Sequence, residues 1–226
     1  MDRSRPLPRT GAALRGTLLL AAACLAASAS GCLHQLLATG IYFAEGGNMV
    51  DAETDALQGR TVVVFCRPPS ASEYSHAGAS RGIARHVSSL LRKNLPEATV
   101  VDPREVDKWL DENDSDDYRA LGQAVGADMV LRIELDEFDL FDGPTLYQGN
   151  ADARIAVYDL AEGGELVFDD QLDSFRFPVH SGIPAQDKPV RQFQNQFVKI
   201  LANEIAIRFY KHNPHDTFAI DAQANR

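Results

Sequence analysis

The stretch TVVVFC (61–66) constrains the fold of this chain most strongly, because five apolar residues follow Thr61 without interruption. A strand that is apolar on both faces has to be covered on both sides, which is typical of parallel strands in α/β proteins. Apolar residues then recur at helical spacing and predict an amphipathic helix over 77–95. The short strand ATVV (98–101) follows. This β-α-β order implies parallel pairing through a right-handed crossover.

Capping residues predict two further helices. Asp102 followed by Pro103 is typical of a helix start, with a capping carboxylate and proline in the first turn. The stretch DYRALGQAVG (117–126) predicts a short helix that Gly126 ends in a left-handed conformation.

The second half of the chain predicts antiparallel strands over 129–136, 151–160 and 165–177. Gly163 and Gly164 predict the tight turn before the last of them. Leu172 keeps the phase of Leu166 and Phe168, whereas Phe175 and Phe177 take the other phase, so we expect a bulge near Asp173. A final amphipathic helix runs from about Phe193 to Phe209.

These segments predict the α/β (α+β) class. The expected fold is a single mixed β-sheet, in the order β-α-β-α-α-β-β-β-α, with helices packed on it, over residues 60–211.

The N-terminal region resembles a bacterial lipoprotein signal peptide. A basic start precedes a short apolar run, and the run ends in Ala29-Ser30-Gly31-Cys32. This resembles the lipobox, although that pattern prefers leucine where Ala29 stands. The resemblance implies that residues 1–31 are removed and that Cys32 carries acyl chains such as palmitate. The alternative is an ordinary secretory signal with an incidental cysteine.

The lipobox interpretation sets the expected location and the expected membrane partner. Residues 32–59 are expected to form a tether and 212–226 a polar tail, with membrane lipid bound through the acylated Cys32. We expect a cell-envelope protein that is lipid-anchored and faces the periplasm. Leu33 after the cysteine, rather than aspartate, favours the outer membrane in a cell with two membranes.

Charge and cysteine content exclude some partners. Removing residues 1–31 takes away four arginines and one aspartate, so the net charge changes from −10 to −13. Such a chain is repelled by phosphate, so we expect no nucleic acid partner and little attraction to anionic lipid. Cys66 then has no intramolecular partner for a disulfide and is expected to be a small buried hydrophobe.

The stretch from VVDPREVDKWLDEN to YRALGQAVGADMVLRIELDEF resembles the α/β domain shared by the TolB N-terminal region and the CsgG family of envelope lipoproteins. The matching residues are Val100, Val101, Asp102, Leu121, Gly122, Gly126, Ala127, Asp128, Val157, Tyr158, Asp159 and Leu160. The resemblance covers most of 60–211 and implies a non-catalytic interaction or assembly role with an unknown envelope protein. The CsgG pore is not implied, because the hairpin carries Asp169, Asp170 and Asp173, which a lipid-facing strand does not tolerate.

Three patterns are candidates for chemistry. Ser80 stands in a G-x-S-x-G motif, but about eleven residues separate that motif from the preceding strand, so a helical position is expected rather than a nucleophile elbow. The acidic segment 111–117 offers ligands for a cation, although a loop in which Asp116 or Asp117 caps the next helix is the preferred interpretation. His212, His215 and Asp216 lack supporting residues for a metal site.

We therefore expect no enzyme, no cofactor, and no catalytic or metal-binding residue. Two alternatives remain open: a periplasmic small-ligand binding protein with a pocket between helices and sheet, and a serine hydrolase that uses Ser80 with a histidine such as His180. Several aromatic residues of the strand region are expected in the core, with some available to a binding surface: Tyr147, Tyr158, Phe168, Phe175 and Phe177.

Overall fold

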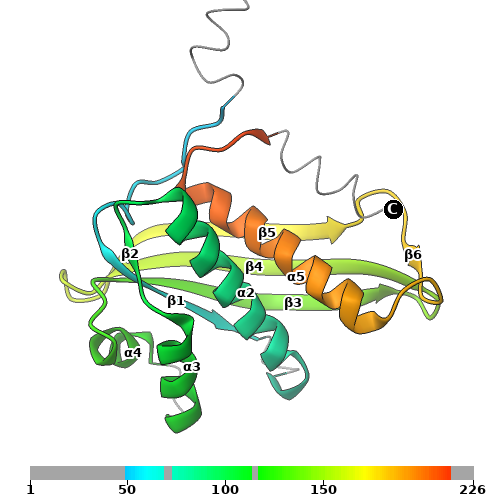
Figure 1. Cartoon of the computed structure of the whole chain (residues 1–226), viewed down its shortest axis with the longest axis horizontal. Helices are drawn as coiled ribbons and strands as arrows, with labels where there is room; N and C mark the ends of the chain where they lie inside the picture. Colours follow the sequence, from blue (N-terminus) through cyan, green and yellow to red (C-terminus); the bar gives the residue numbers. More distant parts are fainter. Residues whose placement is uncertain (1–48, 69–72, 114–116, 215–226) are drawn as a thin grey trace, which may run out of the picture. The chain divides into compact units, whose positions relative to one another are not determined.

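The structure is a computed structural model that describes residues 49–68, 73–113 and 117–214. The predicted signal peptide, Cys32 and the first part of the predicted tether lie outside these ranges. The helices and strands follow in the order β1 (Thr61–Arg67), α2 (Glu73–Asn94), β2 (Thr99–Val100), α3 (Pro103–Glu112), α4 (Tyr118–Ala124), β3 (Met129–Asp142), β4 (Leu146–Asp159), β5 (Glu165–Phe177), β6 (Ile183–Pro184), α5 (Val190–Ala206) and the 3-10 turn η2 (Ile207–Phe209) (Figure 1).

The strands form one mixed sheet in the order β2-β1-β3-β4-β5, with β6 paired to β4. Strand β1 runs parallel to β2 and β3, and the remaining pairs are antiparallel. The predicted fold class is confirmed: a mixed sheet with helices packed on it. The short strand β6 is an addition, because two residues that include Pro184 give no periodic signal.

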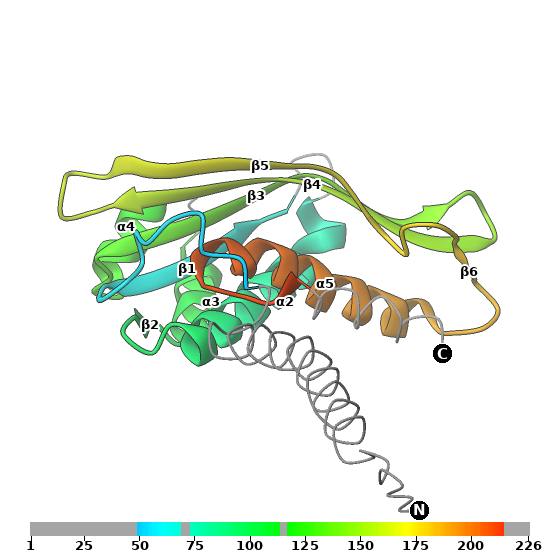
Figure 2. The same cartoon turned by 90° about the horizontal axis from the view of Figure 1, so that it is seen from above.

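Helices cover β1 on both faces, as its sequence requires. Val62, Val64 and Cys66 point into a core shared with α2 and α5, whereas Val63 and Phe65 point into a smaller core shared with α3 and α4. Figures 1 and 2 show α2 and α5 side by side over one face of the sheet. The longer strands β3, β4 and β5 extend beyond α3 and α4 on the other face.

Helix α5 packs an aromatic layer onto β4 and its neighbours. The Phe197 ring lies 5.3 Å from Phe138 and 6.4 Å from Phe193 between centroids. Gly149 of β4 allows this approach, because a Cβ atom at this position would come within 3.0 Å of the Phe197 ring. The ring therefore sits directly on the strand backbone.

Several local predictions are confirmed. The Asp102 carboxylate accepts the N–H of Arg104 at 2.9 Å at the start of α3, and Asp117 caps α4. Gly126 has φ +66°, as predicted for the end of α4. Ala151 pairs with Phe175 and Ala153 pairs with Leu172, so Asp173 and Ser174 form the predicted bulge.

The folded body begins before Arg60, which is a correction to the predicted tether of 32–59. Leu57 is only 1% exposed in the core, and Val50 forms a bridge with His212 through two backbone hydrogen bonds of 2.8 and 3.0 Å. Helix α2 also begins earlier than predicted, at Glu73 rather than residue 77. The extension at residues 50–57 depends on tertiary contacts that a local pattern does not report.

Candidate interaction surface

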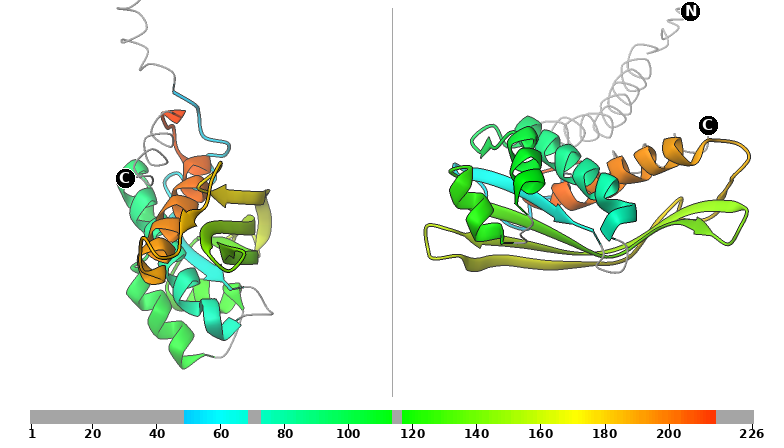
Figure 3. Two further views of the ribbon diagram at one scale, coloured as in Figure 1. Left: turned by 90° about the vertical axis from the view of Figure 1, so that its right-hand side faces the viewer. Right: turned by 90° about the horizontal axis from the view of Figure 1, so that it is seen from below.

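One face of the antiparallel strands lacks a helical cover among the described residues. Its residues come from alternate positions of β3 and β4 and from β5, where Val167 is an extra residue at a bulge. We name this surface the open sheet face: Arg132, Glu134, Arg154, Tyr158, Leu166, Val167, Asp169 and Gln171. Figures 2 and 3 show α2 and α5 together on one side of β3, β4 and β5, and the open sheet face is the other side of these strands.

An ion pair fixes the middle of the open sheet face. The Arg154 guanidinium donates to both carboxylate oxygens of Asp169 on the neighbouring strand, at 2.8 and 2.7 Å. This pairing holds the pKa of Asp169 below its usual value and raises the pKa of Arg154, so both groups stay charged. The planar guanidinium group thus makes two parallel hydrogen bonds to one carboxylate, a geometry that is stronger and more directional than a single hydrogen bond.

Two tyrosines form the border between the open sheet face and α4. The rings of Tyr118 and Tyr158 stack with centroids 4.3 Å apart. The Arg132 guanidinium lies 5.4 Å from the Tyr118 ring centroid, within the range of a cation–π contact, and also bonds Glu134 at 2.5 Å. Tyrosine and arginine held in fixed positions are the residue types enriched at binding hot spots.

An apolar patch adjoins Tyr158 at the edge of the sheet. Leu166 and Val167 are 42% and 43% exposed. Tyr158 pairs with Leu166 and Val157 pairs with Phe168, so the extra residue Val167 forms a bulge that turns Leu166 toward the open sheet face. The alternation in the sequence places Leu166 in the core with Phe168, and the structure corrects this. Three successive apolar residues in a hairpin strand are the signal that could have shown it.

Strand β5 is also an edge strand. Within the described part of the chain it pairs only with β4, along its whole length. Unpaired backbone groups on such an edge are available to an added strand unless charges or bulges block them. The bulges at Val167 and Asp173 interrupt this edge. A partner is therefore expected to bind the exposed apolar patch rather than to add a long strand along β5.

The structure places Ser80 away from any catalytic arrangement. Ser80 lies inside α2, is 2% exposed and contacts the core, so the strand-to-helix turn of a nucleophile elbow is absent at this position. His180 is exposed in the loop between β5 and β6. Cys66 is buried as predicted; burial raises the pKa of its thiol, and a hydrogen bond with Ser80 offsets part of that rise.

The two candidate metal segments lie partly outside the described residues. Asp111 pairs with Arg81 at 2.5 Å and Asp117 caps α4, whereas residues 114–116 are not described. His212 lies beside the Tyr210 carbonyl, and His215 and Asp216 are not described. Within the described ranges no group of three or more histidine, cysteine or acidic residues is placed to hold a metal ion.

One hollow between helices and sheet in the described part of the chain is too small to hold an organic ligand. It lies between β1, α2 and α3, is lined by residues that include Val64, Ala84 and Val106, and measures about 10 Å³. That volume holds about one water molecule. In the part of the chain that is described, no helix is both long enough and apolar enough to cross a membrane.

Comparisons with known proteins give distant structural likenesses. No protein-family model matches the chain, and no curated protein matches it. A PelC dodecamer from Paraburkholderia phytofirmans is similar with a TM-score of 0.41 and 10% identity, over 72% of this chain and 97% of that chain.

Two further solved structures resemble the chain. The lipoprotein GNA1162 from Neisseria meningitidis has a TM-score of 0.39 and 16% identity, over 65% of this chain and 97% of its own. A putative neuraminyllactose-binding hemagglutinin homolog from Helicobacter pylori has a TM-score of 0.34 and 11% identity, over 78% and 94%. A lipoprotein is therefore among the structural neighbours, but similarity this distant assigns no function.

Proposed function

We propose that the chain is a lipid-anchored lipoprotein of the cell envelope that faces the periplasm and works as a non-catalytic interaction module. Its partner is an envelope protein that binds the open sheet face. The observation that carries this proposal is the exposed pair Leu166 and Val167 beside Tyr158, on a face without a helical cover among the described residues. The sequence resemblance to the TolB N-terminal and CsgG domain supports the same role.

The open sheet face has properties that favour binding. Apolar residues provide area that gains free energy when it is removed from water, and the exposed Leu166 and Val167 both retain such area. The Arg154–Asp169 pair and the Tyr118–Tyr158 stack are already ordered, so binding loses less side-chain entropy there. A partner that covers this face would bury an apolar centre with a polar rim, which is the usual anatomy of a protein interface.

Site-specific photocrosslinking in intact cells tests this proposal. A photoreactive amino acid in place of Gln171 reports contacts on the open sheet face, and the same probe in place of Lys108 on α3 is the control. We expect one adduct of defined mass from the first position alone. The substitution Val167→Asp should abolish that adduct without changing the melting temperature, since Val167 is largely exposed.

Two outcomes would contradict the proposed interaction surface. One is the same set of adducts from both probe positions. The other is an adduct from position 171 that survives Val167→Asp. Mass spectrometry of the mature N-terminus tests the anchor separately, and a mature chain that retains residues 1–31 or an unmodified Cys32 would contradict that part.

A further inference from the structure

The helices that cover the other face of the sheet are strongly basic, although the chain is acidic overall. Helix α2 (Glu73–Asn94) contains four arginine or lysine residues and one carboxylate, Glu73. Helix α5 contains a single carboxylate, Glu204, and that group lies 3.9 Å from Arg208. The two helices together carry six arginine or lysine residues and two carboxylates, Glu73 and Glu204, so they are net positive in a chain whose net charge is −10.

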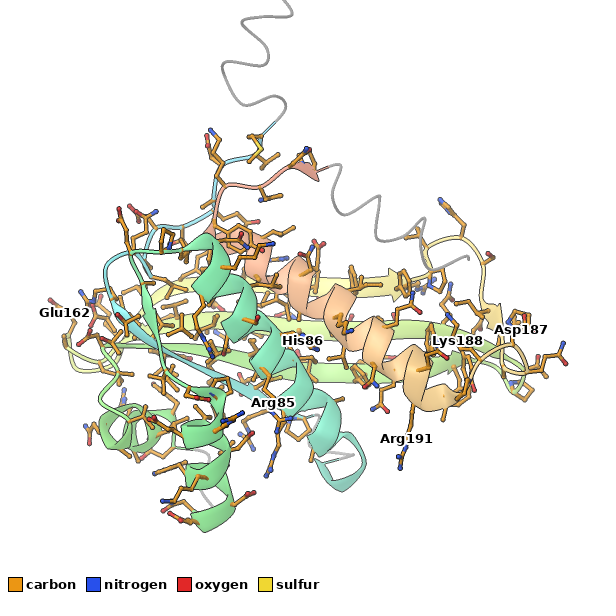
Figure 4. All side chains as sticks on the ribbon, in the orientation of Figure 1. Arg85, His86, Glu162, Asp187, Lys188 and Arg191 are labelled. Carbon is orange, nitrogen blue, oxygen red and sulfur yellow. The ribbon has the colours of Figure 1, made fainter. Side chains whose placement is uncertain are left out.

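These cations lie on the outward side of the helices. Helices α2 and α5 pack against each other, and Figure 4 shows Arg85 on α2 and Arg191 on α5, with Asp187 and Lys188 just before α5. We name this surface the basic helix face; its residues are Arg85, Arg92, Lys93, Lys188, Arg191 and Lys199, all but Lys188 among the exposed positions. Arg85 pairs with Asp107 and Lys188 donates to Gln196, but no carboxylate of the described residues pairs with Arg191 or Lys199.

Part of the acidic charge lies on the opposite side, although Asp107 pairs with Arg85 and Asp187 lines a hollow together with Lys188 and Arg191. Strands β3 and β5 expose Asp136, Glu137, Asp139 and Asp169 along or beside the open sheet face. A layer of helix about 10 Å thick separates this charge from the basic helix face. That thickness is about one Debye length at physiological ionic strength, so an approaching surface responds to the nearer charge.

The described part of the chain begins at Met49, close to Lys93 of the basic helix face. Met49 lines a shallow hollow together with Leu90 and Lys93 of α2 and Asn203 of α5. Residues 33–48 separate this point from the predicted anchor, and even when fully extended they span at most about 55 Å. The anchor would therefore keep the whole folded body, the basic helix face included, near the membrane.

We propose that the basic helix face docks onto the anionic phospholipid headgroups of the membrane that holds Cys32. This inference rests on the proposed lipid anchor. Lysine and arginine near an anionic surface attract it additively, and no enclosed phosphate site is required. The net charge of the whole chain does not decide this contact, because the helices that would face the membrane carry more cations than carboxylates.

Fluorescence quenching on vesicles tests the docking. The processed lipoprotein is reconstituted into vesicles of phosphatidylcholine, with or without phosphatidylglycerol, that contain headgroup-linked nitroxide. A fluorophore is attached through Ser89→Cys on the exposed side of α2, or through Gln171→Cys on the open sheet face as the control. We expect strong quenching at position 89 only when phosphatidylglycerol is present, and weak quenching at position 171 on both vesicles.

Charge-reversal variants connect this readout to the basic helix face. Lys188→Glu, Arg191→Glu and Lys199→Glu together should reduce the phosphatidylglycerol-dependent quenching by at least about fivefold. The same charge change in Arg104→Glu, Lys108→Glu and Arg176→Glu, outside the basic helix face, should leave the quenching unchanged. Thermal unfolding of both variants shows whether the fold is retained.

Two results would overturn the proposed docking directly: equal quenching on both kinds of vesicle, or an equal loss of quenching in the two triple variants. A third is a change in the fluorescence at position 89 on neutral vesicles that grows as the amount of protein per vesicle rises. The last result would identify the basic helix face as a contact between copies of the chain. The mass of the reconstituted protein reports whether Cys32 is acylated, so failure of the anchor is distinguished from failure of the docking.

Discussion

At the scale of single residues, Asp159 ties the start of the sheet to the turn that precedes the apolar patch. Its carboxylate accepts the N–H of Ala161 at 2.9 Å and contacts the Arg60 guanidinium at 2.8 Å, and its carbonyl accepts the N–H of Gly164. The residue is only 6% exposed. The position of β5 therefore depends on a buried charge whose partners are one distant residue, Arg60, and the backbone of the turn that follows Asp159.

We predict that Asp159→Ala lowers the free energy of unfolding by about 2–3 kcal/mol, because it leaves Arg60 and the turn amides without their acceptor. Chemical denaturation by urea measures this change. Asp169→Ala is the matched control, since its ion pair with Arg154 is solvent-exposed and should contribute less than about 1 kcal/mol. Equal losses for the two variants would show that burial of Asp159 does not determine its contribution.

The Cys66 thiol should be inert in the folded protein. Burial raises its pKa far above the usual range, so the reactive thiolate is not formed at neutral or mildly alkaline pH. We predict that a maleimide reagent leaves Cys66 unlabelled in the native protein and labels it fully after denaturation, as read by peptide mass spectrometry. Rapid labelling before unfolding would show that the core around Cys66 opens.

At the scale of elements, Gly149 determines how α5 lies on the sheet, because the Phe197 ring occupies the space of a missing Cβ atom. We predict that Gly149→Ala destabilises the protein by about 1–3 kcal/mol through overpacking. Gly78→Ala, where the space is open and the residue is in a helix, should instead be neutral or slightly stabilising. Phe197→Leu should relieve part of the loss caused by Gly149→Ala, so the free energy of unfolding of the double variant should fall by less than the sum of the two single losses. Additive losses in the free energy of unfolding would contradict the proposed contact.

The elements were predictable from the sequence where the signal was local. Helix caps such as Asp102, the end of α4 at Gly126 and the bulge at Asp173 follow from residue chemistry within a few positions. The sequence pattern assigns Leu57 and Leu166 incorrectly, because burial of the first depends on docking against the C-terminal helix and exposure of the second depends on a pairing register. The open sheet face and the basic helix face were not predicted, since only the folded strands and helices bring their residues together.

At the scale of the whole folded body, two surfaces differ in charge and polarity, and the net charge of the chain does not show this difference. The basic helix face carries the cations of α2 and α5, whereas the open sheet face carries an apolar patch among ordered polar side chains. The two surfaces lie on opposite sides of the sheet (Figures 2 and 3). If the basic helix face lies on the membrane, the open sheet face points away from it and stays available to a protein partner.

This arrangement predicts that the two proposed activities can be separated by substitution. Val167→Asp should abolish the crosslink from position 171 and leave the phosphatidylglycerol-dependent quenching at position 89 unchanged. The triple reversal of Lys188, Arg191 and Lys199 should abolish the quenching difference and keep the crosslink, because the acyl anchor alone still holds the protein near its partner. The two assays on the same set of variants measure this directly. If either variant loses both signals while its melting temperature is unchanged, the surfaces act together, and membrane docking would then be a condition for partner binding rather than an independent contact.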